Sequence, residues 1–83
     1  ERPVRTPLER LEAADRTRQI HRALDELERR SERCARYLRG VLGGSDPADL
    51  AARDRIEPAV LYRRLYRCRE QMRQILAAQG VRP

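Results

Sequence analysis

The sequence contains no phenylalanine and no tryptophan, and tyrosine occurs only three times. A buried core must therefore consist mainly of Leu, Ile, Val and Ala, which are for the most part good helix formers. The chain also lacks an apolar run long enough to span a bilayer and a signal-peptide pattern at its start, so we expect a cytoplasmic protein without a membrane partner. A length of 83 residues suits one domain with one modest core.

Lysine is absent as well: all 19 basic residues are arginine, against 13 acidic residues. Arginine binds phosphates and guanine edges through two parallel hydrogen bonds, so this choice suits a nucleic-acid ligand. A GC-rich genome would produce the same bias. Composition alone leaves both explanations open.

Cysteine and histidine are scarce, with two cysteines and one histidine in the chain. Without a C-x-x-C pair, Cys34, Cys68 and His21 do not make a zinc site, and we expect no metal or other cofactor. The cysteines are predicted to be free thiols on the buried faces of the second and fourth helices, and His21 to be a surface residue. No nucleophile–base pair, carboxylate pair or glycine-rich phosphate loop stands out, so the sequence does not indicate an enzyme.

Positive charge is concentrated towards the C-terminal end. Residues 53–83 carry eight arginines against three acidic residues, whereas residues 1–30 carry eight against seven and residues 31–52 carry three against three. Solvated helix faces usually balance arginine with glutamate four residues away, and the last segment mostly does not. The imbalance favours an electrostatic docking surface.

Apolar residues recur at spacings of three and four along most of the chain, which predicts an all-α fold. Ser45 or Asp46 can cap the third helix, and Pro58 can open the fourth. The expected organisation is a linker over 1–7, a helical domain over 8–79 with helices at about 8–28, 30–41, 47–53 and 58–78, and a tail over 80–83.

The last two helices fit a helix-turn-helix within a four-helix bundle. Ala51 is the small residue needed where the two helices cross closely, and Ile56 is the apolar residue of the turn. Leu61 and Leu65 should anchor the fourth helix to the core. The helical periodicity then turns six residues outward, towards a major groove: Pro58, Ala59, Tyr62, Arg63, Tyr66 and Arg67.

This stretch resembles the C-terminal region of bacterial sigma factors of the extracytoplasmic-function type, whose pattern is E-I-A-x-x-L-G-I-S-x-G-T-V-K-S-R-L-x-R-A-R. The sequence agrees with that pattern at Leu50, Ala51, Ile56, Leu61, Arg64, Leu65, Arg67 and Arg69. The upstream segment ALDELERRSERCARYLRGVLGG resembles the second helix of the same region. The resemblance therefore covers roughly residues 10–78.

The sequence departs from the sigma-factor pattern at two places. Asp54-Arg55 stands where the family has Leu-Gly, and Tyr62 stands where it has Lys. Glycine takes a positive φ at little cost, so the first departure bears on the geometry of the turn. The second bears on which bases the helix would read.

The resemblance implies a domain that reads the upstream hexamer of double-stranded promoter DNA and docks on the β-subunit flap of RNA polymerase. Anti-sigma proteins would be partners that cover the same surfaces. Carried onto this sequence, base contacts would fall to Ala59, Tyr62, Arg63 and Arg67. Phosphate contacts would fall to the amide end of the fourth helix and to Arg53, Arg55 and Arg64.

Two other interpretations remain open. A LuxR-type regulator, a transposase or a phage packaging module would share the helix-turn-helix without a polymerase partner. A helical protein–protein module, for example one that mimics or sequesters a sigma factor, would use the basic face to meet an acidic protein. Binding to core polymerase separates the first interpretation from the sigma factor, and loss of nucleic-acid binding with retention of a protein partner would support the second.

Overall fold

The computed structural model describes residues 6–80, and all regular structure in that range is helical. Four helices follow one another: α1 (Pro7–Arg30), α2 (Glu32–Leu42), α3 (Pro47–Asp54) and α4 (Pro58–Ala78). The all-α prediction is confirmed, and each helix begins and ends within two residues of the expected limits. Most of the expected linker and most of the expected tail lie outside the described residues.

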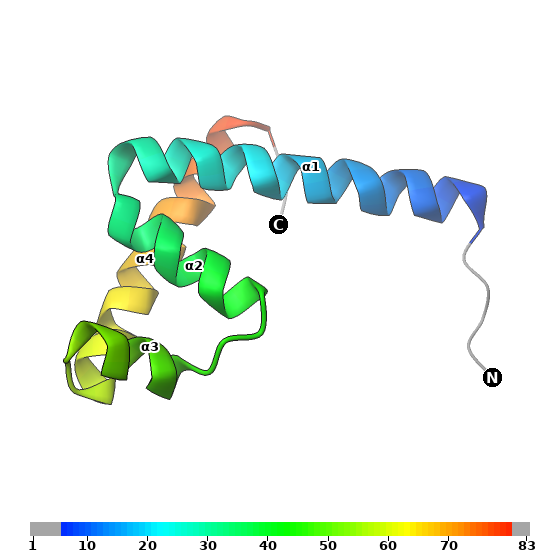
Figure 1. Ribbon diagram of the computed structural model, residues 1–83. Helices are drawn as coiled ribbons and strands as arrows, with labels where there is room; N and C mark the ends of the chain where they lie inside the picture. The colour runs from blue at the N-terminus through cyan, green and yellow to red at the C-terminus, as the bar shows by residue number, and fades with distance from the viewer. Residues whose placement is uncertain (1–5, 81–83) are drawn as a thin grey trace.

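The second half of α1 and the other three helices form the body of the molecule, from which the first half of α1 projects (Figure 1). Within the body, α1 packs on α2 and α4, and α3 packs mainly on α4. The buried residues of α1 begin at Ala23, whereas Leu8 and Leu11 are 65% and 67% exposed. The radius of gyration is accordingly 15.0 Å, against about 12 Å for a compact domain of this length.

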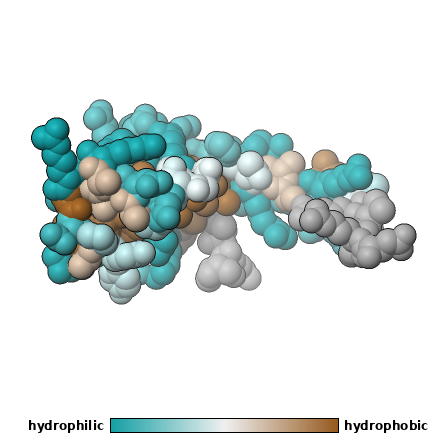
Figure 2. Space-filling view, turned by 60° about the horizontal axis from the view of Figure 1, so that its bottom comes forward, coloured by the Kyte–Doolittle hydropathy of each residue, from teal (hydrophilic) through white to brown (hydrophobic). Residues whose placement is uncertain are grey.

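Helix capping, not tertiary packing, supports the projecting half of α1. The Thr6 hydroxyl accepts the N–H of Glu9, and the Glu9 carboxylate accepts the N–H of Thr6, both at 3.2 Å. This reciprocal arrangement is a capping box, and Pro7 occupies the first helical position, where no N–H is needed. Figure 2 shows this half as mostly hydrophilic surface, with one small hydrophobic patch near its tip.

The core contains one aromatic side chain, Tyr37, among aliphatic and small residues. Tyr37 is fully buried, with a relative exposure of 0%. Leu27, Leu61 and Leu65 are the other large residues at its centre, each no more than 1% exposed. A Cβ added at Gly40 would lie 3.1 Å from a Leu50 methyl, so the glycine allows α3 to approach α2 closely.

Cys34 of α2 and Cys68 of α4 form a disulfide, so the prediction of two free thiols is wrong. The prediction that both lie on buried helix faces is confirmed, since they are 6% and 2% exposed. Periodicity places a residue on a face but does not fix how one helix is rotated and shifted against another. Here the packing of α2 on α4 brings the two Cα atoms to 5.2 Å, within the range that a disulfide spans.

The turn between α3 and α4 adopts the geometry that a glycine normally supplies. Arg55 is left-handed, with φ 55° and ψ 45°, and is the one non-glycine residue with positive φ in residues 6–80. The Ile56 N–H donates to the Ala51 carbonyl at 3.0 Å, and the Arg55 N–H donates to the Ala52 carbonyl at 3.2 Å. These are the two bonds of a Schellman motif. Ile56 then packs against the core, as expected of the turn residue.

Arg55→Gly should stabilise the protein. The left-handed conformation costs arginine about 1–2 kcal/mol, and the greater freedom of glycine in the unfolded chain offsets about 0.5–1 kcal/mol of the relief. We expect a net gain of about 0.5–1 kcal/mol in the free energy of unfolding, measured by urea titration. Arg53→Gly, two residues earlier inside α3, is the matched control and should destabilise; a loss at both positions would show that Arg55 is not strained.

Reduction of the disulfide should lower the free energy of unfolding. The bond closes a loop with a sequence separation of 34, and the chain-entropy model gives about 3–4 kcal/mol for a loop of that length. Urea titrations with and without reductant measure the difference. The double variant Cys34→Ala/Cys68→Ala should unfold at the midpoint of the reduced protein and ignore the reductant; coincident midpoints for oxidised and reduced wild type would contradict the expectation.

Candidate nucleic-acid interface

The first half of α4 exposes the residues that the helical periodicity predicted to face outward. Leu61 and Leu65 are 0% and 1% exposed, and this fixes the rotation of the helix about its axis. Tyr62 and Tyr66 are 59% and 65% exposed as a result. The remaining members of the outward set are also exposed: Pro58, Ala59, Arg63 and Arg67.

The predicted phosphate-binding arginines differ in their surroundings. Arg53 and Arg55, at the end of α3, are exposed. Arg64 is half-buried, and its Nη1 donates to the Tyr37 hydroxyl at 3.2 Å. The Arg64 side chain is therefore held against α2, whereas the other two project into solvent.

The N-terminus of α4 is open. Glu57 has the extended backbone of an N-cap residue, but its side chain makes no capping hydrogen bond, and the first turn holds no acidic residue. Pro58 contributes no N–H. The Val60 N–H donates to the Glu57 carbonyl at 3.0 Å, so the N–H of exposed Ala59 and the positive end of the helix dipole are what the terminus offers to an anion.

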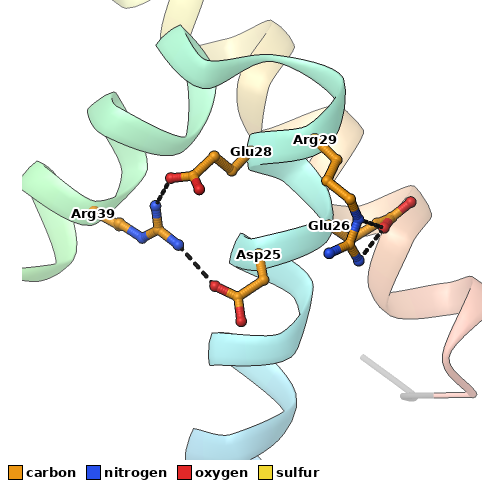
Figure 3. A network of polar contacts seen from close by, with 5 residues as sticks. All are labelled: Asp25, Glu26, Glu28, Arg29 and Arg39. Atoms are coloured by element: carbon orange, nitrogen blue, oxygen red, sulfur yellow. Dashed lines mark hydrogen bonds and ion pairs between the residues drawn. The ribbon is translucent and has the colours of Figure 1, made fainter.

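Arginines on α1 and α2 are largely neutralised by carboxylates. Arg39 lies 2.9 Å from Asp25 and also contacts Glu28, and Arg29 donates to Glu26 at 2.7 Å (Figure 3). The hydrogen bond from Arg29 is the main reason why the pKa of Glu26 lies below its ordinary value. These pairs neutralise much of the positive charge of α1 and α2.

Arginines at the end of α3, in the turn that follows it and on α4 as far as Arg69 make no ion pair within the described residues. Among residues 6–80, no carboxylate lies within 4.0 Å of the guanidinium of Arg53, Arg55, Arg63, Arg64, Arg67 or Arg69. Arg33, at the start of α2, is likewise without an ion pair in that range. Uncompensated arginines beside exposed tyrosines suit a polyanion that also presents flat rings.

A carboxylate at the end of α3 links that helix to α2 through hydrogen bonds. Asp54 accepts two hydrogen bonds from Arg36, at 2.9 and 3.0 Å, and a third from the Tyr37 hydroxyl. Its side chain is 16% exposed. The hydrogen bonds from Arg36 and then Tyr37 lower the pKa of Asp54 from 3.8 to about 2, and the Asp54 bond raises the pKa of Arg36.

Sequence reasoning missed Arg36 and Asp54. One signal was present, because Asp54 stands where the sigma-factor pattern has an apolar leucine, and a carboxylate at a partly buried position needs a cationic partner. The partner itself, 18 residues away in sequence, could not be named before the packing of α2 on α3 was known.

Residues 6–80 hold no cluster of three or more His, Cys, Asp or Glu side chains arranged to bind a metal ion. No helix in the same range is long and apolar enough to cross a membrane. The groups that this region exposes to a ligand are guanidinium groups, phenol rings and helix amides.

Asp54→Asn should lower the free energy of unfolding at neutral pH by about 1–3 kcal/mol, since hydrogen bonds to a charged group contribute about that much. Because the folded-state pKa is about 2 and the ordinary value is 3.8, the contribution is fully present above pH 3.8 and is lost as the pH falls towards 2. Urea titrations at a series of pH values should therefore show wild type and variant converging in acid. Asp15→Asn, on the projecting half of α1, is the control and should give no such convergence; a pH-independent difference for Asp54→Asn would refute the assignment.

Comparison with known proteins leaves this region to be interpreted from its own geometry. The chain matches no model of a known protein family, no curated protein and no solved structure. The features that bear on function are therefore the exposed side chains of α4, the open N-terminus of that helix and the distribution of ion pairs among the arginines.

Proposed function

We propose that this chain is a sequence-specific DNA-binding domain that reads double-stranded promoter DNA, with α3, the Arg55 turn and α4 acting as a helix-turn-helix. The observation that carries the proposal is the set of side chains exposed on the first half of α4. This half of the helix exposes two tyrosines and two arginines without ion pairs, beside an open helix N-terminus. Recognition helices enter the major groove with their N-terminal residues nearest the base edges.

The residues take different roles in this proposal. Arg63 and Arg67 pair with guanine edges, and Tyr62 contacts the neighbouring base. Arg53 and Arg55, with the amide end of α4, bind phosphates. Arg64, held by the Tyr37 hydroxyl, positions α4 and offers its remaining N–H groups to the DNA backbone.

A groove beside the second half of α4 suits a protein partner. This apolar groove has a volume of about 360 Å³, and its walls include Ile20 of α1, Leu42 of α2 and Leu76 of α4, with Arg69 and Arg73 at the α4 side. Leu42 is 63% exposed. The resemblance to sigma factors leads us to assign this groove to the β-subunit flap of RNA polymerase, with an anti-sigma protein as the competing occupant and the cytoplasm as the site of action.

A protein–protein module is the second candidate function. It is favoured by the side chains themselves, because exposed tyrosine and arginine are the residues most enriched at the energetic centres of protein interfaces. An acidic partner would then cover α4 in place of DNA. Loss of duplex binding with retention of such a partner selects this function, and binding to core polymerase separates a sigma factor from other helix-turn-helix regulators.

The test of the proposal is a binding titration against a duplex selected from a random pool and against its scrambled counterpart, at two salt concentrations. Arg63→Ala should weaken binding to the selected duplex by about 1–3 kcal/mol and flatten the preference at one base pair. Arg53→Ala should weaken binding to both duplexes alike and reduce the logarithmic salt slope by about one.

Arg22→Ala is the matched control, because Arg22 is an exposed arginine of α1 that makes no ion pair with any residue from 6 to 80 and lies outside the proposed interface. It should leave both affinities unchanged. If Arg63→Ala instead weakened binding to both duplexes alike, as Arg53→Ala should, α4 would not read bases. The protein-partner function would then become the better candidate.

A further inference from the structure

The disulfide borders a surface hollow, although Cys34 and Cys68 are themselves only 6% and 2% exposed. Cys34 and Cys68 both line a hollow of about 400 Å³, at the place where the start of α2 meets the middle of α4. Three arginines share the lining, Arg33 from α2 and Arg64 and Arg67 from α4. A reagent of modest size in this hollow would lie next to both cysteine residues.

The hollow attracts anions. No acidic side chain is among the residues that line it, and its three arginines make no ion pair within residues 6–80. Gln71 and Ser31 complete the lining with neutral polar groups. Arg64 is linked to Asp54 through the Tyr37 hydroxyl, so Arg33 and Arg67 are the two whose charge has no such link. Guanidinium groups around a concave surface concentrate negative ligands there.

We propose that Cys34–Cys68 is a reversible thiol–disulfide exchange site, and that its reaction partner is a small thiol or disulfide bearing carboxylates, which the hollow's arginines bind. Glutathione is a probe of that chemical class. The inference stands on the hollow and the sulfur pair, and it holds whether or not the chain binds DNA.

The two sulfurs are not equivalent. Cys34 lies in the first turn of α2, where its N–H donates to the Ser31 hydroxyl at 3.2 Å, and it is the more exposed of the pair. A helix N-terminus and neighbouring arginines both favour a thiolate, which is the species that attacks a disulfide. Cys34 is therefore the sulfur that forms the mixed disulfide, and Cys68 is the one that resolves it.

The exchange balances without any other reactant. The Cys34 thiolate attacks one sulfur of the small disulfide, the small S–S bond breaks, and the departing half leaves as a thiolate. The Cys68 thiolate then attacks the Cys34 sulfur and releases the second half. The pair loses two electrons and two protons, the small disulfide gains them as two thiols, and reduction follows the same steps in reverse.

The test measures the rates at which native wild-type protein is reduced by glutathione and by cysteamine, a cationic thiol. Each rate is divided by that of the same thiol with a small neutral disulfide, so intrinsic reactivity cancels. The normalised ratio is the normalised rate with glutathione divided by the normalised rate with cysteamine. It should be greater than one and should fall as the salt concentration rises. Arg33→Gln should lower the ratio about threefold, the effect of one exposed ion pair, and Arg22→Gln should leave it unchanged.

Two trapping variants identify the reactive sulfur. Cys68→Ser, treated with glutathione disulfide, should accumulate the mixed disulfide on Cys34, whereas Cys34→Ser should react much more slowly. A normalised ratio of one that Arg33→Gln does not change would overturn recognition of carboxylates. Reduction no faster than global unfolding, or purified protein that forms no Cys34–Cys68 bond in air, would overturn the exchange site itself. Arg33 and Arg22 are outside the proposed DNA contacts, so these results are independent of duplex binding.

Discussion

One carboxylate joins three of the four helices. Asp54 ends α3, receives hydrogen bonds from Arg36 and Tyr37 of α2, and through the Tyr37 hydroxyl is linked to Arg64 of α4. The network also offsets the cost of burying Tyr37, because its phenol both donates and accepts a hydrogen bond there. Within residues 6–80, no buried side-chain polar atom is left without a partner. The placement of α4 against α2 therefore depends on a charged group at the edge of the core as well as on the apolar core itself.

The disulfide is a second tie between α2 and α4, of a different chemical kind. The Asp54 network loses its charge only in strong acid, since the pKa of Asp54 is about 2. The sulfur pair responds to thiols at any pH at which a thiolate forms. In a reducing compartment such bonds are usually transient or redox-active, and a reversible Cys34–Cys68 pair would accord with the proposed DNA-binding function. The hydrogen-bond network around Asp54 would then join α2 and α4 at neutral pH whatever the thiol concentration, whereas the disulfide would join them only when it is oxidised.

Much of the fold could be predicted from local sequence patterns. Periodicity and proline placement predicted four helices and the buried faces of both cysteines, because each of these depends on residues near one another in the chain. The exposure of Tyr62 and Arg63 followed in the same way once Leu61 and Leu65 were taken as buried. The pairing of Cys34 with Cys68 and of Arg36 with Asp54 could not be derived, since both depend on how separate helices are rotated and shifted. The same packing decides which arginines have a carboxylate partner. The sequence therefore indicated only that residues 53–83 carry more arginines than acidic residues, and not which arginines are unpaired.

The turn at Asp54-Arg55 also constrains the order in which its sequence can change. The Leu-Gly of the sigma-factor pattern and the Asp-Arg of this chain are two complete solutions: one relies on a backbone free to turn, the other on a side-chain anchor that holds a strained backbone. Single steps between them are not equivalent. Arg55→Gly alone keeps the anchor and removes the strain, whereas Asp54→Leu alone would keep the strain and leave Arg36 and the Tyr37 hydroxyl without their acceptor. An evolutionary path from this chain to the pattern would therefore run through an aspartate–glycine turn, with the residue after α3 changing before the residue that ends it.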